Sequence, residues 1–290
     1  MIALYVALAL LVVISIVVII RTIRLKPCET EVERTDITVN KDHAVRSLSD
    51  MIKIPTVSYA DSSKIDNDAF ETFRNYLKTR YPKVMNASQF QTFDKAVLFH
   101  VKGKQSEGPV VLMAHYDVVP AEGTWTHPPF SGHISDTHVH GRGALDTKSS
   151  LSAIMEAMEH LLSEGKTFDR DIWLAFGGDE EVSGVSAPMI TKHLESLGLT
   201  PSMVLDEGGA IVSNVFPGVK RKAAVVGVAE KGFMNIRLIA RSKGGHASSP
   251  PAKSPLTELA QAVSKLNNHP AFVMKMTPPV KKLFDTVAPY

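Results

Sequence analysis

The sequence has few of the features that mark a disulfide-based or nucleic-acid-binding protein. Cys28 is its only cysteine in 290 residues, so it can form neither an internal disulfide framework nor a cysteine-based zinc knuckle. We interpret Cys28 as an incidental thiol. The formal net charge is only +2, and no basic stripe with interleaved aromatic residues occurs, which argues against a nucleic-acid partner. The length allows one large domain or two smaller ones with a substantial core.

Several catalytic and repeat motifs are also missing. The sequence contains neither His-Glu-x-x-His nor Gly-x-Ser-x-Gly, so single-zinc helix proteases and serine hydrolases have no support. The segment ending in Lys148-Ser149 resembles a phosphate-binding loop superficially. That loop needs glycine at two positions where this chain has Arg142 and Thr147, which excludes the reading. There are no internal repeats and no low-complexity tract.

One long apolar run stands at the N-terminus. Residues 2–20 carry no charge, and only Tyr5 and Ser15 interrupt their apolar character. At about 1.5 Å per residue such a run spans roughly 28 Å, close to the hydrocarbon thickness of a bilayer. A signal peptide has a shorter apolar region, usually about 7–15 residues. No basic region precedes this run and no small-residue cleavage site follows it. We therefore predict a single-pass membrane anchor over residues 1–20.

The segment after this run is polar and charged. Residues 21–42 show no apolar period and are predicted to be a juxtamembrane linker. The basic residues Arg21, Arg24 and Lys26 would lie on the cytoplasmic side under the positive-inside rule. An extracytoplasmic enzyme would go against this local charge, so the side of the membrane is left open.

From residue 43 to residue 221, apolar strand-like runs alternate with helical periodicity. This alternation is typical of an α/β domain with a mostly parallel sheet. Helices are expected near residues 45–52, 70–77 and 148–164, and strands near residues 96–101, 110–114, 171–176 and 203–205.

A different order begins near residue 222. Residues 223–229 and 233–240 have the composition of two strands, and residues 256–266 follow as an amphipathic helix. This strand–strand–helix order predicts a second, α+β domain over residues 222–290.

Acidic residues and one histidine gather where the predicted strands of the first domain end. In open α/β sheets, ligands bind outside the carboxyl ends of the strands. An imidazole and several carboxylates there form a nitrogen- and oxygen-rich pocket suited to zinc or a similar divalent metal. Each cluster alone is a weak signal. Together they predict a metallohydrolase, because each cluster lies in a short loop after a predicted strand. The residues are His115, Asp117, Asp146, Glu180, Glu181, Asp206 and Glu207.

These segments resemble the M20 family of dinuclear zinc peptidases and aminoacylases. The similarity is greatest to the branch of carboxypeptidase S and the N-fatty-acyl-amino-acid hydrolases, and it runs from about residue 43 to the C-terminus. The segments that carry it are residues 115–120, 125–130, 141–143 with Asp146 and Lys148, 179–181 with Gly184, and 206–209.

The resemblance implies a fold and a set of roles. Residues 43–221 would be the catalytic domain, and residues 222–290 would belong to an inserted ferredoxin-like lid that also mediates homodimer formation. The implied roles are His115 and Asp206 binding the first zinc, Asp146 bridging two zinc ions, Glu181 binding the second, Glu180 as general base, Asp117 orienting His115, and His246 holding substrate. Glu207 is the alternative to Asp206, because the sequence does not fix which neighbour turns inward.

The implied function is hydrolysis of amide bonds in small peptides or N-acyl amino acids by a membrane-anchored zinc enzyme. The family also uses a late metal-binding histidine, and nothing before Tyr290 matches it. We therefore expect the chain to be an N-terminal part of a longer protein, with both domains incomplete. The alternative is a catalytically inactive, membrane-tethered module that keeps a partial metal site.

A second histidine group lies at residues 133–140. His133, His138 and His140 are close in sequence, and histidines two apart on a strand can hold a metal. No acidic residue completes a site nearby, so the sequence favours a surface hairpin.

Overall fold

The computed structural model describes residues 1–27, 37–230, 232–242, 244–246, 248–249, 253–269 and 272–290. Cys28, part of the predicted linker and Pro250-Pro251 lie outside the described residues. The chain divides into two units, one formed by Arg34–Glu207 and one by Met1–Glu33 with Gly208–Tyr290. We call Arg34–Glu207 the sheet unit.

The N-terminal run forms one uninterrupted helix, α1 (Ile2–Ile23), that is long and apolar enough to cross a membrane. The hydroxyl groups of Ser15 and Thr22 are satisfied within the helix, since Ser15 Oγ donates to the carbonyl of Leu11 and Thr22 Oγ1 to that of Val18. By length and composition, a membrane anchor and a signal sequence both fit this helix.

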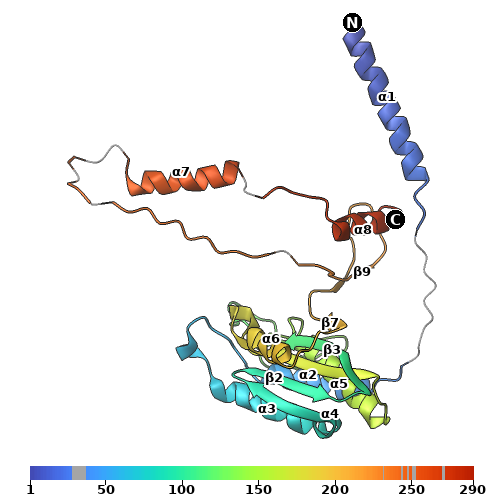
Figure 1. The fold of residues 1–290 in the computed structure, drawn as a ribbon, viewed down its shortest axis with the longest axis vertical. Coiled ribbons are helices and arrows are strands. Elements are labelled where there is room, and N and C mark those ends of the chain that lie inside the picture. The colour runs from blue at the N-terminus through green and yellow to red at the C-terminus, as the bar shows by residue number, and fades with distance from the viewer. Residues whose placement is uncertain (28–36, 231, 243, 247, 250–252, 270–271) are drawn as a thin grey trace. The chain divides into compact units, whose positions relative to one another are not determined.

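The sheet unit is built on a five-stranded mixed sheet in the order β1-β2-β6-β3-β7 (Figure 1). The three strands β6, β3 and β7 are parallel, and the hairpin β1-β2 extends them antiparallel through β2. This confirms the predicted α/β class. The strands are β1 (Ser88–Phe93), β2 (Ala96–Val101), β3 (Gln105–His115), β6 (Arg170–Gly177) and β7 (Met203–Leu205).

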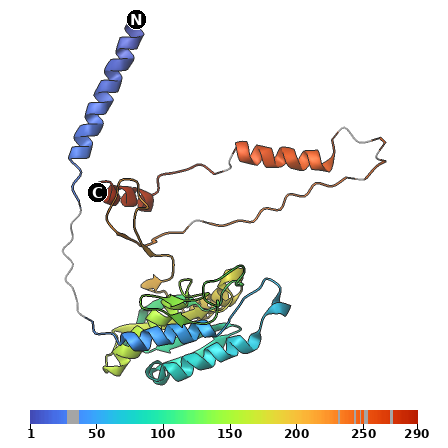
Figure 2. The ribbon, with the colours of Figure 1, turned by 180° about the vertical axis from the view of Figure 1, so that it is seen from behind.

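Helices cover both faces of this sheet, because successive strand residues point to opposite sides. On β6, Leu174 and Phe176 pack into the core shared with α2, α3, α4 and α5, whereas Trp173 and Ala175 face Ile190 of α6. Figure 2 shows α2 and α3 side by side on the first of these faces. The helices are α2 (Lys41–Lys53), α3 (Asn67–Arg80), α4 (Pro82–Ala87), α5 (Lys148–Ser163) and α6 (Ser186–Ser196).

The predicted helix at residues 148–164 is confirmed as α5, and its buried side chains lie on one face of the helix. Short elements fill the connections. They are the one-turn 3₁₀ helices η1 (Ser62–Lys64) and η2 (Glu180–Val182), and the hairpin of β4 (His133–Ile134) and β5 (Val139–His140). This antiparallel pair confirms the hairpin that was predicted for the histidine-rich segment at residues 133–140.

The described residues after Gly208 form two short strands and two helices. β8 (Ala210–Val212) pairs antiparallel with β9 (Ala223–Val225), and the helices are α7 (Pro255–Asn268) and α8 (Pro278–Val287). The predicted helix near residues 256–266 is confirmed. The predicted strand at residues 233–240 is wrong for the part of the chain that the structure describes, because a strand needs a hydrogen-bonding partner and none pairs with this segment.

Candidate metal centre

Three parallel strands bring the candidate residues to one edge of the sheet. His115 is the last residue of β3 and pairs in register with Gly177, the last residue of β6. β7 ends at Leu205 beside Leu112 of β3. Parallel strands have their carboxyl ends on the same side, so the loops that follow all three strands lie together there.

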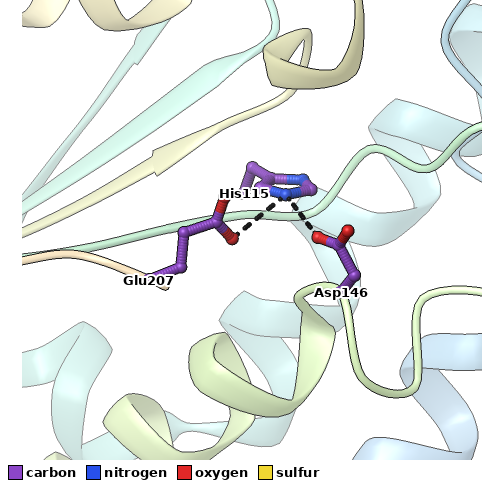
Figure 3. A group of neighbouring side chains, drawn as sticks. All are labelled: His115, Asp146 and Glu207. Atoms are coloured by element: carbon purple, nitrogen blue, oxygen red, sulfur yellow. Dashed lines mark hydrogen bonds and ion pairs between the residues drawn. The ribbon is translucent and has the colours of Figure 1, made fainter. Parts of the chain in front are cut away.

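The imidazole of His115 faces three carboxylates. Its Nε2 lies 3.1 Å from Oδ1 of Asp146, 3.3 Å from Oε2 of Glu207 and 3.7 Å from Oε2 of Glu180. Figure 3 shows Asp146 and Glu207 approaching the same ring nitrogen. The ring itself is buried, whereas the side chain of Asp146 is 70% exposed. The group is therefore a rigid nitrogen ligand with carboxylates that remain open to solvent.

Asp117 is fully buried and connects the other side of this ring to the loop after β6. The Nδ1 of His115 lies 3.0 Å from the backbone carbonyl of Asp117 and 3.4 Å from its carboxylate Oδ1. The same carboxylate accepts hydrogen bonds from the backbone N–H groups of Glu180 and Glu181, each at 3.1 Å, and from the hydroxyl of Ser58 at 2.8 Å. Asp117 thus holds η2 in place as well as lying beside the imidazole.

A second aspartate shapes the loop between η2 and α6. The carboxylate of Asp179 accepts hydrogen bonds from the backbone N–H groups of Val185 and Ser186, at 2.8 and 3.1 Å. A Cβ on Gly184 would stand 2.1 Å from this carboxyl carbon, so only glycine fits there. The glycine of this motif is therefore required by close packing against Asp179.

Lys148 joins the start of α5 to the end of α2. Its side chain is fully buried, and its Nζ donates to the backbone carbonyls of Met51 at 2.9 Å and Ile54 at 2.7 Å. Burial lowers the pKa of Lys148 to about 7, although the charge of Asp117 acts in the opposite direction. Lys148 fixes the first turn of α5, which directly follows the loop that carries Asp146.

The electrostatics of the group indicate an excess of negative charge. Burial raises the pKa of Glu180, Glu181 and Glu207, and the neighbouring carboxylates raise it further, whereas His115 lowers it. Burial lowers the pKa of His115, but Asp117, Glu207 and Glu180 outweigh it and raise the value to about 9. A divalent cation among these groups would relieve the repulsion between the carboxylates and take the place of the imidazole proton.

The residue types fit a metal of the zinc type. One ligand atom each from His115, Asp146 and Glu207 lies within 4.8 Å of the other two. One imidazole nitrogen and two carboxylate oxygens match the donors that zinc takes from proteins, and three protein ligands is the number found at catalytic zinc sites. The sheet unit therefore contains a group able to hold a metal ion.

The structure brings some of the predicted site residues to His115 and leaves others apart from it. It brings His115, Asp146, Glu180 and Glu207 together, and it ties Glu181 to the same loop through its backbone. From the pair after β7, the structure turns Glu207 rather than Asp206 toward His115, and the Asp206 carboxylate instead accepts the backbone N–H of Glu207 at 2.9 Å.

One predicted site residue and one missed residue lie in other segments. His246 is an exposed residue after Gly208, and its role in holding substrate stays a prediction. The second is Ser58, whose hydroxyl reaches Asp117 because Val57 pairs in parallel with Val118. No motif marks this serine, so only the pairing of the two segments could reveal it.

Comparison with known proteins identifies a family over most of this site. Peptidase family M20/M25/M40 matches residues 111–282. The chain is 37% identical over 281 residues to "Probable carboxypeptidase S-like 2" of Dictyostelium discoideum, which covers 90% of this chain and 53% of the relative. It is 38% identical over 229 residues to "N-fatty-acyl-amino acid synthase/hydrolase PM20D1" of Homo sapiens, covering 77% of this chain and 45% of the relative.

The chain thus spans about half the length of the curated relatives that it matches. Among solved structures, an M20 family metallo-carboxypeptidase from Sulfolobus solfataricus aligns with a TM-score of 0.48 and 23% identity, covering 58% of this chain and 38% of that one.

Proposed function

Because this chain belongs to peptidase family M20/M25/M40, we propose that it is a zinc-dependent hydrolase of amide bonds in small peptides or N-acyl amino acids. The observation that carries the proposal is the buried His115 imidazole, whose Nε2 faces Asp146, Glu207 and Glu180 within 3.7 Å at the carboxyl edge of the sheet. The names of the two relatives, a carboxypeptidase S-like protein and an N-fatty-acyl-amino acid synthase/hydrolase, support the substrate class.

His115, Asp146 and one residue of the Asp206–Glu207 pair would hold the first zinc ion. Glu207 is favoured by its 3.3 Å approach to His115 Nε2. Asp146 and Glu181 would hold a second ion, since Asp117 fixes the backbone of Glu181 at the same edge of the sheet. When bound, such ions supply a polarising charge for a carbonyl group and lower the pKa of water.

Glu180 is suited to move protons at this site. Its backbone is fixed by Asp117, its carboxylate Oε2 lies 3.7 Å from His115 Nε2, and its side chain stays 55% exposed. Burial and the surrounding carboxylates raise its pKa, which brings a carboxylate closer to the range in which it can both accept and return a proton. We assign it the role of general base toward water and of proton donor to the leaving amine.

Asp117 would act through its neighbours rather than on the substrate. Its backbone carbonyl and carboxylate lie beside Nδ1 of His115, which selects the tautomer that presents Nε2 to a metal. Its hydrogen bonds to Glu180 and Glu181 keep both glutamates at the same end of the sheet.

We also propose that α1 anchors the protein in a membrane. The helix has 22 residues, which at about 1.5 Å each reach the roughly 30 Å of a hydrocarbon core. The hydroxyls of Ser15 and Thr22 donate within the helix, so neither leaves an unsatisfied donor in lipid.

Two substitutions separate the roles of the site. Glu180→Gln keeps the backbone and should retain zinc while lowering amide hydrolysis by about 10²–10⁴-fold, because only the base is lost. Asp146→Asn should lower zinc content, since it removes a ligand charge. The measurements are zinc content by mass spectrometry and hydrolysis of dipeptides and N-acyl amino acids.

Full zinc content in Asp146→Asn together with loss of zinc in Glu180→Gln would overturn the assignment. Wild-type protein that binds zinc and cleaves none of these substrates would instead support an inactive, membrane-tethered module.

A further inference from the structure

Three histidines outside the candidate metal centre come together on the surface of the sheet unit. His133 of β4 and His140 of β5 are direct cross-strand partners, and their ring centroids lie 5.6 Å apart. His127, from the loop before β4, stacks on His133 with centroids 3.9 Å apart and lies 4.8 Å from the ring of His140. From the sequence, the group was expected to consist of His133, His138 and His140. In the structure, His127 rather than His138 lies against both His133 and His140.

The three rings lack the carboxylate partner that several other histidines of the sheet unit have. His43 pairs with Glu156 at 2.8 Å, His100 with Asp171 at 2.8 Å, and His160 with Glu164 at 3.4 Å. Within the described part of the chain, no carboxylate comes within ion-pair distance of His127, His133 or His140. Their grouping is therefore not explained by salt bridges.

The rings are close enough for one zinc ion to reach all three after their side chains rotate. With zinc–nitrogen bonds of about 2.0–2.1 Å in tetrahedral geometry, the centroids of two bound imidazoles lie roughly 5 Å apart. The observed centroid distances of 3.9, 4.8 and 5.6 Å bracket this value. In the structure the rings stack instead of pointing their nitrogens at one point, so binding requires rotation of the side chains. His133 is exposed and the other two rings are half-buried, which leaves room for that rotation.

The local hydrogen bonds leave ligand atoms available. His140 Nε2 lies 3.0 Å from the hydroxyl of Ser135, so its Nδ1 is the atom offered to a metal.

We propose that His127, His133 and His140 form a surface zinc site separate from the His115 centre. Bound zinc would clamp the loop that carries His127 to the β4–β5 hairpin. This hairpin continues directly into the loop that ends at Asp146, so the clamp would also fix the segment leading to that carboxylate.

The test measures zinc binding to the full chain and chemical protection of its histidines. Wild-type protein is treated with diethyl pyrocarbonate with and without zinc, and modified residues are mapped by peptide mass spectrometry. His138 is the matched control, because it lies on the same hairpin 5.8 Å from His140 and its Nδ1 is engaged by the Thr137 hydroxyl at 2.7 Å. We expect zinc to protect His127, His133 and His140 but not His138.

The second test compares the number of zinc ions bound per chain in wild-type protein and in variants. The triple variant with His127→Gln, His133→Gln and His140→Gln should bind one zinc fewer per chain after equilibrium dialysis, whereas His138→Gln should bind as many as wild type. The same loss is expected in a His115→Gln background, which separates this site from the His115 centre. An unchanged zinc count in the triple variant, or equal protection of His138, would overturn the proposal. If the triple variant fails to fold, the protection pattern of wild-type protein decides.

Discussion

The buried carboxylate of Asp117 gives the sharpest test of how the fold supports the site. It accepts three hydrogen bonds, from Ser58 Oγ and from the N–H groups of Glu180 and Glu181. In Asp117→Asn, the amide oxygen can keep one of these N–H groups, but the new NH₂ group is a donor. At least one backbone N–H of η2 then loses its acceptor, which costs about 1–3 kcal/mol of unfolding free energy. The Nδ1 side of His115 also loses its adjacent negative charge.

The effect on metal binding should exceed the effect on stability. Changing a residue that orients a metal ligand lowers metal affinity by about 10–100-fold, and Asp117→Asn also loosens the loop that carries Glu180 and Glu181. We expect a loss in this range when zinc is titrated in competition with a chromophoric chelator. Stability is followed by urea unfolding of the full chain in detergent, using the fluorescence of Trp125 and Trp173 in the sheet unit.

Asp171→Asn is the matched control for Asp117→Asn. Asp171 is also buried, at 2% exposure, and accepts the N–H of Gly103 at 2.8 Å while pairing with His100 at 2.8 Å. It lies at the start of β6, at the opposite end of that strand from η2. We expect a similar cost in stability with zinc affinity unchanged. Equal zinc affinity in wild type and Asp117→Asn, or an equal loss in Asp171→Asn, would refute the reasoning.

Three further outcomes are expected. Glu207→Gln should weaken zinc binding more than Asp206→Asn, because Glu207 contacts His115 at 3.3 Å; the reverse order in a zinc titration would assign the ligand to Asp206. Zinc affinity should rise as the pH increases toward about 9. The reason is that the pKa of His115 is raised to about 9, and the imidazole must lose its proton before it can bind zinc. A zinc affinity that is constant from pH 6 to 9 would contradict this. Protein with α1 intact should remain in the membrane fraction after alkaline washing, and a mature N-terminus beyond Ile23 would show a cleaved signal sequence instead.

Local pattern was sufficient to predict most elements of the sheet unit. The period of apolar residues gave α5 and the strands near β2, β3 and β6 because these segments bury one or both faces in the core. The same reasoning failed at residues 233–240. The apolar composition of this segment is that of a strand, but its described residues find no partner, and strand structure depends on hydrogen bonds from another segment.

For the candidate site, the sequence by itself determined the chemical groups and the edge of the sheet where they gather. The strand pattern places His115, Glu180 and the Asp206–Glu207 pair after three strands, and parallel strands end on one side. That much follows from local pattern and strand direction alone.

Only the tertiary structure decided which side chains meet. The turn after β7 directs Glu207 rather than Asp206 to His115, and the pairing of Val57 with Val118 brings Ser58 to Asp117. In the same way, packing of a loop on the β4–β5 hairpin adds His127 to two other histidines. Each of these contacts depends on how a loop folds back onto a distant segment, and the local spacing of residue types carries no information about that path.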